Sequence, residues 1–221
     1  VVKYGRLTTG NSLNDNDKAY LALDRDYSTG DYFASVVKVD EPQAASGLVI
    51  YRGRIKEINE GKNFTVESFS ELQGTDWRYS NTPKTFNITF DTRMLNDDGV
   101  LNVRDFKGYG DESYLQRTVY VVADGPNAVL VSTAPHGTKH IRGTVYSVED
   151  NEILLYKASI YDEATHMWKT VSDARINLLN NTVIIHNGKV GSADSIRKGS
   201  IIRVIKKDAN TEGDGYIIFV E

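Results

Sequence analysis

The sequence predicts an all-β protein made of tandem small β-barrel or β-sandwich modules, with an incomplete unit at its N-terminus. Its apolar runs are short, mostly alternating, and rich in β-branched and aromatic residues, which favours strands. Gly, Asn and Asp punctuate these runs, and no stretch of about 12 residues keeps helical spacing. The chain also repeats itself: residues 51–56 read Tyr-Arg-Gly-Arg-Ile-Lys and residues 141–146 read Ile-Arg-Gly-Thr-Val-Tyr.

The expected strands follow one another closely, as in a sandwich or barrel. Turn signals that tolerate positive φ lie at residues 60–63, 96–99, 124–127, 149–151 and 187–188. Single helical turns are expected at 102–106 and 192–197. The strands are expected at residues 20–23, 32–37, 47–51, 64–69, 85–90, 118–122, 128–131, 143–148, 152–156, 175–179, 182–185, 200–205 and 216–220.

The repeat sets the expected domain organisation. Trp77 follows Gly53 by 24 residues and Trp168 follows Gly143 by 25, so the only two tryptophans occupy matching places. Such a repeat predicts units that stack on their neighbours. We expect a partial N-terminal β unit or assembly arm at 1–47, β module 1 at 48–134, a short linker at 135–139 and β module 2 at 140–221.

The N-terminal segment itself resembles part of a unit. Residues 30–37 and 47–50 read like residues 199–205 and 215–218, which suggests the tail of a third copy. The segment is then either the end of a longer array or a truncated cap. Because Val1 is neither an initiator Met nor the start of a signal peptide, we expect a processed precursor or an excised fragment.

Composition excludes several classes of function. The net charge of −4, with basic and acidic residues interspersed, argues against nucleic-acid binding, which needs a clustered basic surface. The absence of Cys excludes disulfides, thiolate metal sites and a Cys nucleophile. No apolar run approaches the ~20 residues that span a bilayer, so we expect no membrane insertion.

Catalytic and metal motifs are weak. No Gly-x-Ser-x-Gly elbow or phosphate loop occurs, so we expect no catalytic residue, no cofactor and no enzyme. His136 and His140 have metal-like spacing, but Pro135 and Gly137 make the segment a linker. Oxygen-rich turns make Asp15, Asp17, Asp97 and Asp98 candidates for a weak structural Ca²⁺ site, but β-turns that use the tolerance of Asn and Asp for positive φ are the favoured explanation.

The repeated tryptophans allow two interpretations. A Trp that recurs in each unit is most simply a core residue, because it buries a large area. An exposed indole also stacks on sugar rings, so Trp77 and Trp168 are the candidate residues if the chain binds carbohydrate. Blue-shifted tryptophan fluorescence that sugars do not change favours the core role.

Residues 141–221 also support a family resemblance. An Arg-Gly pair, an apolar strand, an Asn-Gly turn and then Gly-Ser-Ile-Ile-Arg-Val-Ile with a closing strand resemble the tandem β modules of bacterial secreted proteins that carry surface-layer homology segments. The resemblance implies an extracellular or cell-surface location and a structural, lattice-forming or spacer role without catalysis. It assigns no functional residue.

The expected function is therefore that of a non-catalytic structural protein of a bacterial surface layer or filament, with further copies of itself as partners. The N-terminal arm is expected to pair with a neighbouring subunit by strand addition. The alternative is a module that binds cell-wall polysaccharide through Trp and Tyr stacking.

Overall fold

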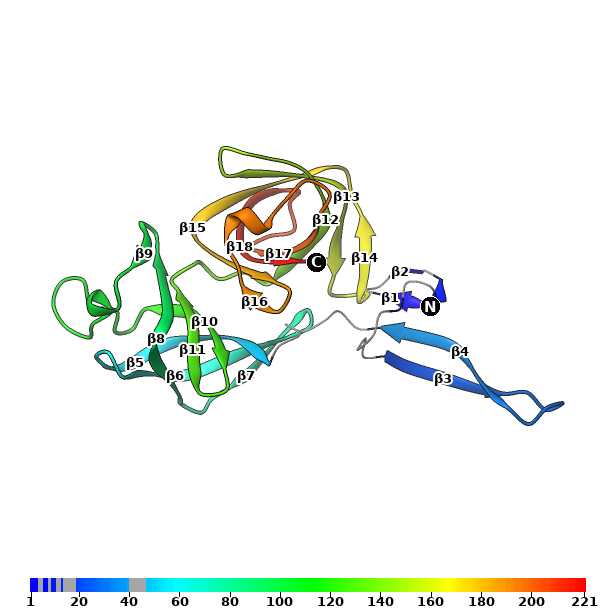
Figure 1. Cartoon of the computed structure of the whole chain (residues 1–221), viewed down its shortest axis with the longest axis horizontal. Coiled ribbons are helices and arrows are strands. Elements are labelled where there is room, and N and C mark those ends of the chain that lie inside the picture. The colour runs from blue at the N-terminus through cyan, green and yellow to red at the C-terminus, as the bar shows by residue number, and fades with distance from the viewer. Residues whose placement is uncertain (4–5, 8, 11–12, 14–18, 40–46) are drawn as a thin grey trace.

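The computed structural model describes residues 1–3, 6–7, 9–10, 13, 19–39 and 47–221, and strands dominate them. They form three sheets: a small N-terminal one and two larger ones with the same strand order. Figure 1 shows the two larger sheets as adjacent modules and the N-terminal strands as an extension beside them. The predicted all-β class, with tandem modules and an incomplete N-terminal unit, is confirmed.

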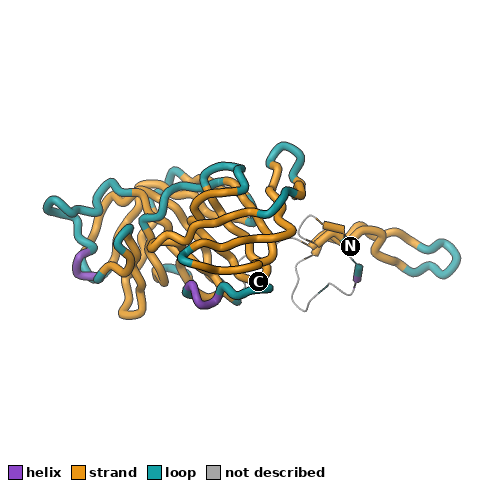
Figure 2. Tube along the Cα trace, turned by 90° about the horizontal axis from the view of Figure 1, so that it is seen from above, coloured by secondary structure: helices purple, strands orange, loops and turns teal. Residues whose placement is uncertain are grey.

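The N-terminal sheet has the order β2-β1-β4-β3. Its main part is a hairpin of β3 and β4, which pair antiparallel from Ala19↔Val39 to Arg25↔Tyr32. Figure 2 shows this hairpin extending away from the modules. The four strands are β1 (Val2–Lys3), β2 (Arg6–Leu7), β3 (Ala19–Arg25) and β4 (Tyr32–Val39).

Module 1 is a barrel closed by pairing around a ring of five strands. In that ring β5 pairs with β6 and β10, β11 joins β10 to β8, and β8 pairs back to β6. The elements are β5 (Leu48–Asn59), β6 (Asn63–Gln73), β7 (Asp76–Ser80), β8 (Lys84–Asn96), β9 (Gly99–Leu101), the 3-10 turn η2 (Val103–Asp105), β10 (Thr118–Asp124) and β11 (Asn127–Ser132).

Module 2 repeats the same ring, with β15 pairing to both β13 and β18. Both barrels contain one parallel pair, β11 with β8 in module 1 and β18 with β15 in module 2. The elements are β12 (Lys139–Glu149), β13 (Glu152–Asp162), β14 (Met167–Thr170), β15 (Ala174–His186), β16 (Lys189–Val190), the 3-10 turn η3 (Ala193–Ser195), β17 (Ile201–Lys206) and β18 (Glu212–Val220).

The repeated Gly of the Arg-Gly pair lies where two strands cross closely. A Cβ on Gly53 would lie 2.7 Å from the carbonyl oxygen of Ser68 and 2.8 Å from the Cβ of Val66. A Cβ on Gly143 would lie 3.1 Å from the Cβ of Leu155. A side chain at Gly53 would therefore collide with the neighbouring backbone, and one at Gly143 would be crowded against Leu155. This is the close backbone approach that a Gly within a strand indicates.

A repeated threonine holds the bend of the longest strand in each barrel. The buried Thr92 hydroxyl accepts from the Thr89 amide at 2.8 Å and donates to the Ala128 carbonyl oxygen at 2.7 Å. Thr182 does the same for the Leu179 amide at 2.9 Å and the Gly215 carbonyl oxygen at 2.7 Å. The pairing register with the parallel neighbour shifts at both places. Each hydroxyl thus satisfies backbone groups that the bend removes from the ladder.

Two finer sequence expectations are wrong. Residues 175–179 and 182–185 belong to one strand, β15, because the Asn180-Asn181 pair occupies a bend held by Thr182 and does not form a turn. Residues 48–50 do not close a third copy. They open β5 and pair with residues 122–124 of β10, whereas β4 pairs with β1 and β3. A Gly followed by apolar residues marks a strand, but it does not identify the strand's partner.

We expect Thr92→Val and Thr182→Val each to lower the free energy of unfolding by about 1–3 kcal/mol, because each leaves buried backbone groups without a partner. Chemical denaturation followed by circular dichroism measures the loss. Thr→Ser at the same positions is the matched control, since it keeps the hydroxyl. If the Val variants are as stable as the Ser variants, the hydroxyl does not hold the bend.

Candidate functional sites

The two barrels share a hydrophobic core. On β10, Val119 and Val121 point into module 1, while Tyr120 and Val122 belong to a separate cluster between the modules. Burial of a Val or Ile side chain contributes about 1.5–3 kcal/mol, so this contact is a major part of the structure. The buried residues of the shared core are Ile50, Leu72, Leu95, Tyr120, Val122, Leu130, Ala134, Val183, Ile185, Ile205, Tyr216 and Ile217.

Polar contacts surround the shared core. The side-chain amide of Asn181 donates to the Asp97 carboxylate at 2.7 Å, and the Ser132 hydroxyl donates to the backbone carbonyl oxygen of Asn181 at 2.6 Å. Across the same interface, the Arg203 guanidinium donates to the Gly74 carbonyl oxygen at 3.2 Å. These bonds connect the turn between β8 and β9 and the end of β6 to module 2. Because hydrogen bonds are directional, they fix the orientation of one barrel on the other, in addition to the apolar area buried between them.

Trp77 lies on β7 and packs at the shared core. Its ring centroid is 5.8 Å from that of Tyr120, and its indole N–H donates to the Gly137 carbonyl oxygen at 3.2 Å. The Gly137 amide in turn donates to the Tyr120 hydroxyl at 3.0 Å. Trp77 therefore anchors the segment between β11 and β12 to module 1.

Trp168 occupies the equivalent strand of module 2, β14, in a different environment. The Arg142 guanidinium lies 4.2 Å from the centroid of its ring, and the Tyr161 ring lies 5.4 Å away. Arg142 belongs to the second Arg-Gly pair and is buried. Trp168 thus covers a buried cation, and the face of an indole ring attracts a cation that lies over it.

His140 is a buried titratable group at the interface between the modules. It is 1% exposed, and its Nδ1 lies 3.1 Å from an Arg203 nitrogen. Arg203 can only donate, so Nδ1 accepts and the neutral ring carries its proton on Nε2. Burial, and then the charge of Arg203, lowers the pKa of His140 well below its ordinary value. The fold therefore requires a neutral His140.

We expect the protein to lose stability as the pH falls below about 6.5, the ordinary His pKa. There the unfolded chain binds a proton at His140 that the folded chain excludes, so acid favours unfolding. His140→Gln keeps an acceptor for Arg203, and its free energy of unfolding should fall less between pH 7.5 and 5. Burial also lowers the pKa of His136, so some dependence should remain.

The exposed His166→Gln is the control and should behave as the unmodified protein does. An equal loss of stability on acidification in His140→Gln and in the unmodified protein would contradict this assignment. The measurement is a denaturant titration of each variant at both pH values.

The acidic Ca²⁺ candidates lie in different surroundings. Asp15 and Asp17 fall outside the described residues. The Asp97 carboxylate accepts from Asn181, and the Asp98 amide donates to the Asn96 side chain at 3.1 Å, as in an Asx turn. In the part of the chain that the structure describes, no three His, Asp or Glu side chains gather closely enough to hold a metal ion.

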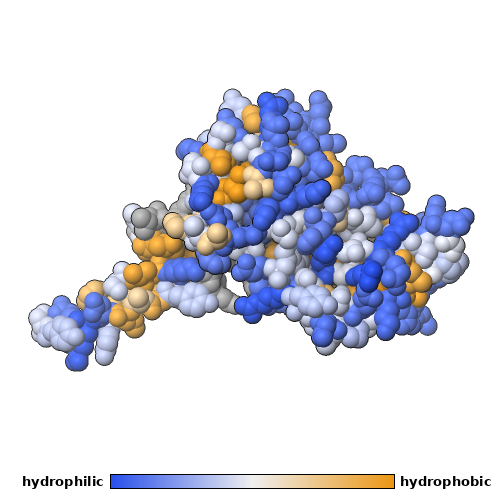
Figure 3. Space-filling model, turned by 180° about the vertical axis from the view of Figure 1, so that it is seen from behind, coloured by the Kyte–Doolittle hydropathy of each residue, from blue (hydrophilic) through white to orange (hydrophobic). Residues whose placement is uncertain are grey.

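The β3–β4 hairpin is an exposed apolar feature of the N-terminal region. Every residue of β3 is exposed, and so are most residues of β4. Figure 3 shows apolar residues along this projection. No described strand pairs with the outer edge of β3. The exposed apolar and aromatic residues of the hairpin are Tyr20, Leu21, Leu23, Tyr27, Tyr32, Phe33 and Val36, between 49% and 91% exposed.

The turn of the hairpin is well specified. The Asp26 carboxylate accepts from the Ser28 hydroxyl at 2.6 Å and from the Ser28 amide at 2.8 Å, which lowers the pKa of Asp26. Gly30 adopts a φ of 79°, and its amide donates to the Asp26 carbonyl oxygen at 2.7 Å. The bond from Gly30 to Asp26 spans four residues, as in an α-turn, so the apolar strands are presented by a turn with defined hydrogen bonds.

Fold and surface together define a tandem β-barrel protein with an exposed apolar β arm. No family model matches the chain, and comparisons with curated proteins and with solved structures find no significant match. Among the described residues, none of the helical segments has the length and hydropathy needed to cross a bilayer.

Proposed function

We propose that the chain is a non-catalytic, extracellular structural protein, a building block of a bacterial surface layer or filament. Its copies associate through the β3–β4 arm. The resemblance of residues 141–221 to modules of surface-layer-type proteins agrees with this role. The single observation that carries the proposal is the arm itself, whose apolar side chains are exposed along both strands.

Physical considerations favour a partner for the arm. A two-stranded hairpin is marginally stable in water unless a third strand or a packed face supports it. Among the described residues of the arm, only Lys38 and Val39, at the end of β4, pair with a third strand, β1. An edge strand such as β3 offers unpaired N–H and C=O groups to another chain. Adding a neighbour's strand satisfies these groups and removes Leu21 and Leu23 from water.

The kind of contact determines the kind of assembly. If the arm of one copy binds a different surface of the next copy, the contact is head-to-tail and extends into a filament or lattice. If two arms pair with each other, the assembly closes as a dimer. The proposed building block uses the first arrangement, with the two packed barrels as the repeating body.

We expect the double substitution Leu21→Lys and Leu23→Lys to abolish association, because it places two charges on the exposed edge strand. Analytical ultracentrifugation and electron microscopy of the unmodified chain should show concentration-dependent polymers that the variant lacks. The variant should unfold at the same temperature as the unmodified protein, because the arm contributes little to either barrel.

The matched control is Val100→Lys, which places a charge at an exposed apolar residue of β9 in module 1. This variant should assemble normally. An arm variant that polymerises like the control rejects the arm as the contact, and a chain that stays monomeric at every concentration rejects self-assembly.

A further inference from the structure

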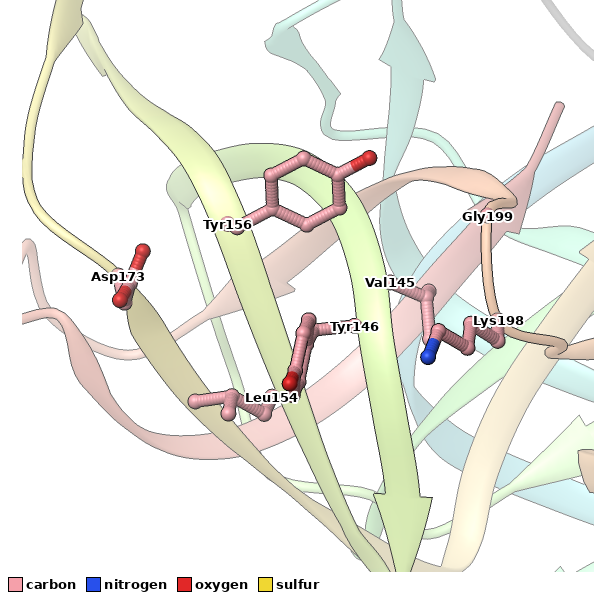
Figure 4. Close-up of a pocket in the computed structure, with 7 residues that line it drawn as sticks. All are labelled: Val145, Tyr146, Leu154, Tyr156, Asp173, Lys198 and Gly199. Atoms are coloured by element: carbon pink, nitrogen blue, oxygen red, sulfur yellow. The ribbon is translucent and has the colours of Figure 1, made fainter.

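Module 2 carries an open cavity of about 460 Å³ on its surface. Figure 4 shows two tyrosines in it, Tyr146 from β12 and Tyr156 from β13, with Asp173 on one side and Lys198 on the other. The tyrosine rings are 6.4 Å apart and nearly perpendicular, at 82°. Leu154 completes the apolar lining. The volume is in the range of about 300–1,000 Å³ that small-molecule sites have.

Comparison with module 1 shows that the barrel does not require these tyrosines in order to fold. The repeated Gly aligns Tyr146 with Lys56. Tyr156 is paired with Thr144, and at the matching place in module 1 Glu67 forms an ion pair with Arg54. Module 1 thus folds with charged residues at both positions. The aromatic pair is a property of module 2 alone.

A bulge directs Tyr146 outward. The pairing of β12 with β13 shifts register between Val145 and Ser147, and the pairing of β5 with β6 shifts between Ile55 and Glu57. Bulges redirect side chains, and here both barrels use one to project a residue from the surface. In module 2 that residue is a tyrosine, and it is 52% exposed.

The chemistry of the lining indicates the class of ligand. A tyrosine ring stacks on the C–H face of a sugar ring, while its hydroxyl donates to and accepts from sugar hydroxyls. The Lys198 ammonium lies 5.1 Å from the Tyr146 ring centroid and supplies donors, and Asp173 supplies acceptors. One charge of each sign gives no net preference for a charged ligand.

We propose that this cavity, formed by Tyr146, Tyr156, Lys198 and Asp173, is a binding site for an uncharged sugar unit of a glycan. The site is separate from the arm. It gives the structural protein an attachment point for polysaccharide that is independent of its contacts with other copies.

An apolar occupant, such as the arm of another copy, fits less well. It would cover Lys198 and Asp173 without offering them partners, and desolvated polar groups without hydrogen bonds are costly. A polyhydroxylated ring satisfies these groups and the tyrosine faces together. The mixed lining therefore favours a sugar over a hydrophobic protein segment.

The test is isothermal titration calorimetry of the full chain with chitohexaose and maltohexaose as neutral probes and hexagalacturonic acid as an anionic probe. At least one neutral probe should bind. The double variant Tyr146→Lys and Tyr156→Glu should weaken that binding by about tenfold or more, because both stacking faces are lost. These residues are the ones module 1 carries, so the variant should keep its fold and its melting temperature.

Lys56→Ala with Glu67→Ala, at the equivalent surface of module 1, is the matched control and should bind as the unmodified chain does. If the double tyrosine variant is unstable, Lys198→Ala should still weaken binding. The proposal is overturned if no neutral probe binds, if only the anionic probe binds, or if the tyrosine variant binds normally. It is also overturned if that variant loses self-assembly and keeps its affinity for the probe, because the cavity then holds a protein segment.

Discussion

The shared core between the barrels is the contact on which the rest of the structure depends. In each small barrel one strand, β10 in module 1 and β17 in module 2, is buried on both faces. The outer face of such a strand has to be covered by something outside its own barrel. The other module provides that cover, since Tyr120 and Val122 of module 1 belong to one buried cluster with Ile205 and Ile217 of module 2. The polar contacts of Asn181 and Arg203 and the anchoring of the linker by Trp77 follow from bringing these faces together.

Much of this architecture was predictable because it repeats. The Arg-Gly pair, the recurring tryptophan and the similar succession of strands are local patterns that appear twice, and they predicted two all-β modules. The continuous apolar run at 118–122 also carried information about burial on both faces. In a half-buried strand every second residue is exposed, whereas the consecutive residues Val119, Tyr120 and Val121 are all buried.

Other features were not predictable from local pattern because they depend on strand partners. A Gly and an apolar run suggested that residues 47–50 end a unit, yet their partner β10 shows that they begin one. Thr92 and Thr182 look like ordinary polar residues until the bends bring their hydroxyls to the carbonyl groups of a parallel strand. The signal available in the sequence was that both copies carry a threonine at the same position of the repeat.

The surface features proposed as functional follow the opposite rule, because they are found where the copies differ. The glycines at the crossings and the bend threonines recur because each barrel needs them to close. Tyr146 and Tyr156 do not recur, and Lys56 and Glu67 at the same places in module 1 show that closure does not depend on them. An exposed aromatic residue that the scaffold does not need costs solubility without adding stability. Differences between two copies of one scaffold thus separate residues kept for folding from residues available for binding, and in this chain they point to one face of module 2.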